Sequence, residues 1–169
     1  MTPLSADAIR HHLAYNAWAN QRLLEAVAPL TPELRSRDFG SAYKSIQGTL
    51  THCLRAERSW LRRIDQGAAE HLFSAADEEG WDALVAEWLR IQQAWRDWAA
   101  SLSDSDASRV IDYKDLKDNT WSNSLWQIVL HVVNHSTHHR GQVSAFLRAS
   151  QIGPPTLDFI AFVRQNSGR

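Results

Sequence analysis

Large apolar side chains recur at alternating steps of three and four residues between positions 81 and 102, and this spacing is the strongest constraint on the fold. The seven positions are Trp81, Leu84, Trp88, Ile91, Trp95, Trp98 and Leu102. On an α-helix they form one stripe, the seam that helices bury in a left-handed bundle. The spacing therefore predicts a long bundle helix, capped at Asp77, whose tryptophans fill the core and do not form a binding site.

Three further long helices follow from helical periodicity and from their end signals. We predict them over residues 5–27, 45–66 and 124–151. Prolines follow the first, Gly67 follows the second, and Gly153-Pro154-Pro155 stops the last. Ser124 and Gln127 have the spacing of a capping box at the start of the last helix.

The remaining segments are a polar stretch over residues 103–123 and a short helix predicted over residues 156–164. Within the polar stretch, the sequences VIDY and NTWS could pair as a short hairpin. The sequence thus predicts an all-α four-helix bundle with a long crossover before the last long helix and a short C-terminal helix. We expect one domain over residues 1–169.

Charge and cysteine content restrict the partners and the compartment. The 18 basic and 19 acidic residues leave a net charge of −1, which argues against nucleic-acid binding. A single cysteine, Cys53, excludes an intramolecular disulfide, and no apolar stretch resembles a signal peptide or a membrane span. We therefore expect a soluble cytoplasmic protein with no membrane or nucleic-acid partner.

The segment HVVNHSTHHRGQ, residues 131–142, holds four of the eight histidines. At about 100° per residue, His135 and His139 lie one turn apart on the inward stripe of the predicted helix, and His131 and His138 lie toward its edge. Two inward imidazoles at this spacing can bind one metal ion, which offsets the cost of burying them. The alternative is a hydrogen-bonded pair of core histidines without metal.

A metal ion needs at least a third ligand, which should come from another helix, and His52 is the candidate. Its own face carries the small residues Gly48, Thr49, Ala56 and Ser59, which would leave a cavity beside the ring. From spacing alone, a surface or hydrogen-bonded histidine fits equally well. Ser136 stands where an HExxH protease has its glutamate, so this class is disfavoured. Three imidazoles would leave an open position on Zn²⁺ or Ni²⁺ for a reactive water.

Three motifs resemble the DinB/YfiT-like family of metal-dependent proteins. They are YNAWAN at 15–20, HCLRAE at 52–57 followed by Trp60, and HSTHHRGQ at 135–142. The resemblance spans nearly the whole chain. It implies a zinc or nickel ion held by His52, His135 and His139.

Some members of this family are thiol-cofactor-dependent transferases or isomerases. The resemblance therefore implies a metal-dependent hydrolase, or a transferase that uses a low-molecular-weight thiol, acting on a small-molecule substrate. A noncatalytic metal-binding bundle protein associated with stress is the alternative, and a helical interaction domain without metal is a third hypothesis.

Several neighbouring residues receive separate predictions. We expect His131 to be an outer donor, with a fourth ligand as the alternative. Arg140 is expected to form a structural ion pair at the edge of the bundle, with recognition of an anionic substrate as the alternative, and Gly141 to allow close approach of another backbone. Glu57 is expected to be solvated or structurally paired, and Cys53 to be a small buried apolar residue.

The predicted last long helix is apolar on its outer side as well. Trp126, Leu130 and Val133 lie opposite the histidine stripe. Such a helix needs a second cover, either the C-terminal helix or another subunit. On this basis we expect a homodimer.

Overall fold

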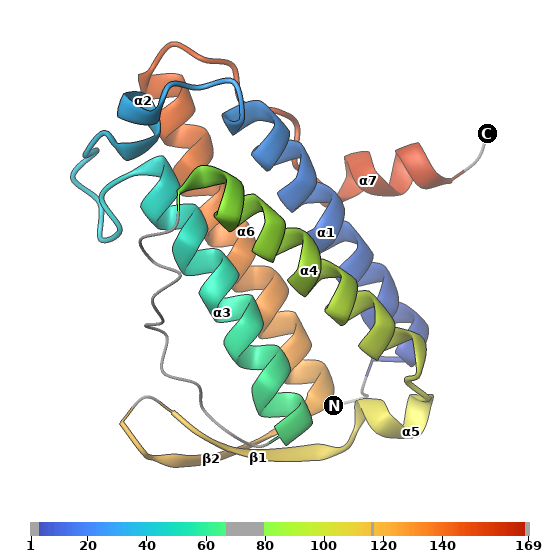
Figure 1. Ribbon diagram of the computed structural model, residues 1–169. Helices are drawn as coiled ribbons and strands as arrows, with labels where there is room; N and C mark the ends of the chain where they lie inside the picture. Colours follow the sequence, from blue (N-terminus) through green and yellow to red (C-terminus); the bar gives the residue numbers. More distant parts are fainter. Residues whose placement is uncertain (1–3, 67–79, 116, 168–169) are drawn as a thin grey trace.

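The computed structural model describes residues 4–66, 80–115 and 117–167. Its elements in chain order are α1 (Ala6–Val27), α2 (Pro32–Ser36), α3 (Ile46–Gln66), α4 (Trp81–Ala100), α5 (Asp104–Ala107), β1 (Val110–Lys114), β2 (Thr120–Ser124), α6 (Leu125–Ala149) and α7 (Phe159–Asn166). The predicted four-helix bundle and short C-terminal helix are confirmed (Figure 1).

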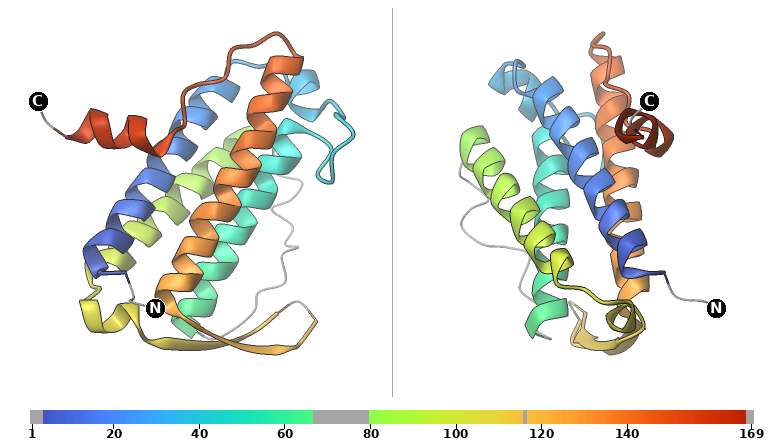
Figure 2. Two further views of the ribbon diagram at one scale, coloured as in Figure 1. Left: turned by 180° about the vertical axis from the view of Figure 1, so that it is seen from behind. Right: turned by 90° about the vertical axis from the view of Figure 1, so that its right-hand side faces the viewer.

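The four long helices pack in a ring in which α6 contacts α1 and α3, and α4 contacts the same two helices from the other side. In Figures 1 and 2, α1 and α6 run in one direction and α3 and α4 in the other. Within the described segments, no helix combines the length and the apolar character that crossing a bilayer requires. Because α3 and α6 lie side by side, residues far apart in the sequence meet along their contact.

The apolar stripe of α4 is the seam that its spacing predicts. Leu84, Trp88, Ile91 and Trp95 are buried, whereas Trp81, Trp98 and Leu102 are half-buried against the same core. Gly80 is the N-cap residue and the helix begins at Trp81, while Asp77 lies outside the described residues. The four buried side chains account for the place of α4 in the bundle.

The segment between α4 and α6 contains α5 and the hairpin that VIDY and NTWS suggest. Strands β1 and β2 are antiparallel, with Val110 opposite Ser124 and Lys114 opposite Thr120. Ser124 ends the second strand and caps α6, and its backbone N–H donates to Gln127 Oε1 at 3.1 Å, as the capping box predicts. The hairpin lies at the end of the bundle where α3 ends and α6 begins (Figure 1).

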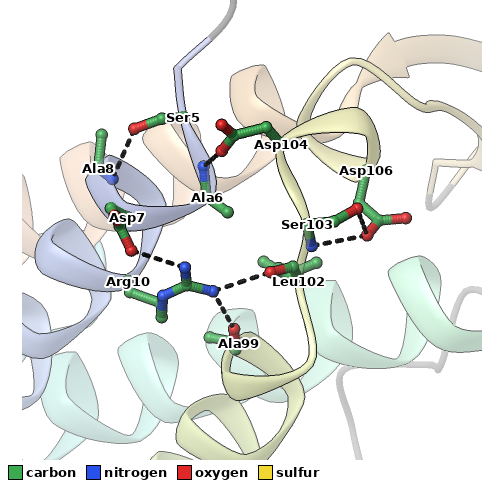
Figure 3. A network of polar contacts seen from close by, with 10 residues as sticks. All are labelled: Ser5, Ala6, Asp7, Ala8, Arg10, Ala99, Leu102, Ser103, Asp104 and Asp106. Atoms are coloured by element: carbon green, nitrogen blue, oxygen red, sulfur yellow. Dashed lines mark hydrogen bonds and ion pairs between the residues drawn. The ribbon is translucent and has the colours of Figure 1, made fainter.

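A polar network joins the start of α1 to the end of α4 (Figure 3). Arg10 donates to the carbonyl oxygens of Ala99 and Leu102, at 3.2 and 2.9 Å. These carbonyls lie at the C-terminal end of α4, where a cation is favourable. Asp104 in turn accepts from the backbone N–H of Ala6 at 2.7 Å. The two helices are therefore fixed to each other at this end.

Helix α7 supplies part of the second cover expected for α6. It starts at Phe159, three residues after the predicted start. Its buried Phe162 forms an apolar cluster with Val133, Tyr15 and Ala19. Val133 is therefore covered by the C-terminal helix of its own chain.

Candidate metal centre

Three histidines from two helices converge at the contact between α3 and α6. Ring nitrogens of His52, His135 and His139 all lie within 4.8 Å of one another. The Nε2 atoms of His52 and His135 are 3.0 Å apart, which is about the separation of two nitrogens that each lie roughly 2.0–2.1 Å from one zinc ion. The structure thus brings together the three residues predicted as ligands, and their donor set fits a divalent transition metal.

The surroundings keep these imidazoles neutral, the form that binds metal. Burial, with a smaller contribution from the neighbouring histidines, lowers the pKa of His52 to about 4 and that of His135 to about 3. Burial also lowers the pKa of His139, although its bond to Gln142 acts in the opposite direction. Little proton competition therefore opposes metal binding at neutral pH.

Gln142 orients the ring of His139. The Nδ1 atom of His139 lies 2.7 Å from Gln142 Oε1. Since an amide oxygen only accepts, the proton is on Nδ1 and the lone pair is on Nε2, the tautomer that a metal-binding histidine needs. Gln142 therefore fixes the orientation of His139.

Tyr43 covers the site and was not identified from the sequence. Its ring stacks on His52 at a centroid distance of 3.8 Å and meets His139 edge-on at 5.4 Å. A Cβ at Gly48 would overlap the carbonyl oxygen of Tyr43, so only glycine lets this loop approach α3 so closely. The small residue was visible in the sequence, but its partner was not.

A cavity of about 540 Å³ opens beside the histidines. His52 and His135 line one part of it, and Ala56 and Ser59 belong to its wall, as the small face of the helix predicted. Gly48 contacts the Tyr43 loop instead, and Thr49 is buried with its hydroxyl donating to the carbonyl of Ser45. The hairpin also contributes to the lining, through Asp115, Lys117, Asn119 and Trp121.

A second polar cluster fills the contact of α3 and α6 with α1. Glu57 Oε1 accepts hydrogen bonds from Asn16, Asn20 and Ser136 at 2.8, 2.9 and 2.8 Å. Arg140 donates to the amide oxygens of the same asparagines at 2.6 and 2.7 Å. Of the two states predicted for Glu57, the paired one is confirmed. Arg140 has a structural role, as predicted, but the ion pair expected at the edge of the bundle is wrong, because its partners are neutral side chains in the bundle interior.

The predictions for the remaining neighbours have different outcomes. His131 does not belong to the convergent group, and its ring packs edge-on against Trp60 at 5.1 Å. Cys53 is buried in the core, as predicted, and burial raises the pKa of its thiol. The prediction for Gly141 is wrong, because nothing lies within 4 Å of where a Cβ would stand.

Of the histidines outside the last long helix, only His52 among the described residues lies at the site. His11 and His12 pack against Phe159 of α7, away from the site. His71 lies outside the described residues. His52 is therefore the described histidine from another helix that reaches the inward pair.

The four-helix bundle and the three convergent histidines between α3 and α6 place this protein in the class of helical bundles with a candidate metal site. The model of the DinB family matches residues 3–167. The chain belongs to the DinB family.

Relatives support the same assignment at low identity. Protein DinB of Bacillus subtilis (strain 168) is 21% identical over 152 residues, which cover 86% of this chain and 87% of that protein. A DinB-like protein from Bacillus cereus ATCC 10987 has a similar crystal structure, with a TM-score of 0.72 at 15% identity over 92% of this chain and 99% of that one. A second DinB-like protein, from B. subtilis, gives a TM-score of 0.64 at 15% identity over 89% and 98%. These two structures establish the fold.

Proposed function

We propose that this protein is a metal-dependent enzyme in which His52, His135 and His139 hold a zinc or nickel ion. One observation carries the proposal: two of the three convergent histidines, His52 and His135, line a cavity of about 540 Å³. A site that serves only to stabilise the bundle needs no such opening. The proposed reaction is the transfer of a low-molecular-weight thiol to a small molecule, or the hydrolysis of a small molecule.

The residues of the chain supply the binding and orientation that this chemistry needs. His52, His135 and His139 would hold the ion, which when bound would lower the pKa of a coordinated water or thiol toward neutrality. Gln142 holds His139 in one tautomer, and the stacked ring of Tyr43 shields His52 on one side. The cavity beside His135 provides space for a substrate.

The test compares His139→Ala with His138→Ala, a matched change at the neighbouring exposed position. Metal content is measured by elemental analysis of purified protein, and activity by a screen for thiol-dependent transfer and for hydrolysis. We expect His139→Ala to lose the metal while the bundle stays folded, and His138→Ala to keep it. Full metal occupancy in His139→Ala would overturn the ligand assignment.

The same experiment separates the enzyme from its noncatalytic alternative. Stoichiometric metal with turnover that His139→Ala abolishes supports the enzyme. Stoichiometric metal without turnover in either screen favours a noncatalytic metal-binding bundle, and absence of metal favours a helical interaction domain.

We also propose a homodimer and a cytoplasmic location, as expected from the sequence. The case for the dimer now rests on a different surface, because Phe162 covers Val133. Phe159 and Ile160 of α7 are large apolar side chains that stay exposed, at 38% and 53%.

A further inference from the structure

Arg63 is a buried cation that lines the cavity and lacks a full set of partners. The residue is only 7% exposed, and its Nε has no hydrogen-bond partner among the described residues. Its guanidinium lies over the ring of Trp60, 4.6 Å from the centroid. A buried guanidinium normally has hydrogen-bonded partners, because desolvation without them is costly. Arg63 is thus prepared for an anion that the chain does not provide.

Asp115 is a carboxylate that interacts electrostatically with Arg63, but its oxygens accept hydrogen bonds from other groups. The donors are the backbone N–H groups of Lys117 and Asn119 and the indole N–H of Trp121. These bonds fold the turn of the hairpin. Asp115 therefore shapes the wall of the cavity and leaves the donors of Arg63 to another acceptor.

Ser59 adds a second unpartnered donor one turn away. Its side-chain oxygen is buried without a hydrogen-bond partner among the described residues, and the residue lines the same cavity. Ser59 and Arg63 are four residues apart on α3, so their side chains share one face of the helix. Arg63 and Ser59 differ from other buried donors in that both line the same cavity, where one ligand could accept from both.

We propose that Arg63 and Ser59 form an anion subsite that binds the carboxylate of a small organic acid. This inference rests on the proposed function, because it takes the cavity beside the metal to be the substrate site. The cavity carries Arg63 and Lys117 against Asp115, a balance that suits a monoanion better than a phosphate dianion. Trp60 and Trp121 in its wall suit a ligand with an apolar or aromatic body.

The position of the subsite defines how the ligand lies. His52 and Arg63 are eleven positions apart on α3, or about 16 Å along the helix axis, and the side chain of Arg63 leans back toward His52. An acid held at Arg63 therefore extends its body past Trp60 and presents its other end to the histidines. The site should therefore select ligands whose carboxylate lies at the opposite end from the group that reaches the histidines.

The test uses 3-phenylpropanoate and its neutral analogue 3-phenylpropan-1-ol as probes, with binding followed by tryptophan fluorescence. Wild-type protein is expected to bind the acid roughly 10- to 100-fold more tightly than the alcohol, the range of a charge-assisted hydrogen bond. Arg63→Met should lose this preference, Arg63→Lys should keep part of it, and both should bind the alcohol like wild type. The control Arg148→Met, an exposed arginine of α6, should behave like wild type.

Equal binding of acid and alcohol by wild type, or an unchanged preference in Arg63→Met, would overturn the subsite. Folding does not confound the result, because Arg63→Met removes an incompletely paired buried charge and should melt at no lower temperature than wild type.

Repeating the titration in His139→Ala separates this proposal from the metal site. A preference that survives there and depends on Arg63 supports the subsite, even if metal analysis contradicts the proposed function. A preference that disappears in His139→Ala but persists in Arg63→Met places the acid on the metal and overturns the subsite.

Discussion

Helices α3 and α6 carry two polar clusters, one facing α1 and the other facing the cavity and the hairpin. In the cluster that faces α1, Glu57 and Arg140 are joined through two asparagines. In the other, His52 and His135 meet at an open cavity, and the buried Nε of Arg63 has no described partner. The same pair of helices thus holds one cluster whose charged groups are joined through asparagine side chains and one whose polar groups line an open cavity.

The difference separates polar groups that stabilise a fold from polar groups that await a ligand. Arg140 and Arg63 are almost equally buried, at 2% and 7% exposure, so burial alone does not distinguish them. The Nε atom does not distinguish them either, because it lacks a partner in both. The difference lies in the other contacts: Arg140 donates to Asn16, Asn20 and Thr137, whereas the contacts of Arg63 are with aromatic rings beside the cavity. A buried charge with hydrogen-bonded partners supports the fold, and one without them lowers stability unless a ligand pairs with it.

The largest expected effect comes from removing Glu57 from the polar cluster that faces α1. Glu57→Ala removes the acceptor of three hydrogen bonds and leaves Arg140 buried without a counter-charge. We expect the free energy of unfolding to fall by about 3–5 kcal/mol, measured by urea denaturation. The control Glu87→Ala breaks ion pairs with Arg90 and Arg58 nearer the surface and should cost less, about 1 kcal/mol. A loss below that of the control would show that the Glu57 network is not structural.

A smaller effect is expected from removing the hydrogen bond between Gln142 and His139. This prediction rests on the proposed metal site. Gln142→Leu removes the acceptor that orients His139. Metal affinity should fall roughly 10- to 100-fold while the free energy of unfolding of the metal-free protein changes little. Competition with a metal indicator measures the affinity, and Arg148→Met on the same helix serves as the control. An affinity equal to that of wild type would refute the orienting role of Gln142.

The smallest effect concerns the glycine between the two clusters. Gly141→Ala should raise the free energy of unfolding by about 0.5–1 kcal/mol, because the added Cβ meets open space and alanine favours the helix. Gly48→Ala should lower it, since the backbone at Tyr43 would have to move. Urea denaturation of both variants measures the contrast. Destabilisation by Gly141→Ala would restore the close approach first expected at this position.

Much of the candidate site could be predicted because helical periodicity is a local property. The turn between His135 and His139 places both on one face, and the DinB resemblance added His52. The role of Arg63 could not be predicted, because an arginine eleven residues after His52 looks like any solvated charge. Only the packing of the hairpin over α3 buries it and leaves its Nε without a partner.

The contacts of Tyr43 and Arg140 could not be predicted from the sequence either. Tyr43 reaches His52 through a loop whose path depends on a contact with Gly48, and no periodic pattern describes such a contact. Arg140 follows the histidines on the same helix, and the sequence allowed an ion pair at the edge of the bundle. Its partners are asparagines of α1, more than a hundred residues earlier, and only the packing of α1 on α6 brings them together.

By itself, the sequence determined the helices, their buried faces and the inward histidine pair, because these follow from side-chain spacing along one chain segment. The tertiary structure decided which polar groups are satisfied. Hydrogen-bond partners come from helices that are distant in the sequence, and the free-energy cost of a buried charge depends on those partners and not on its own position in the chain.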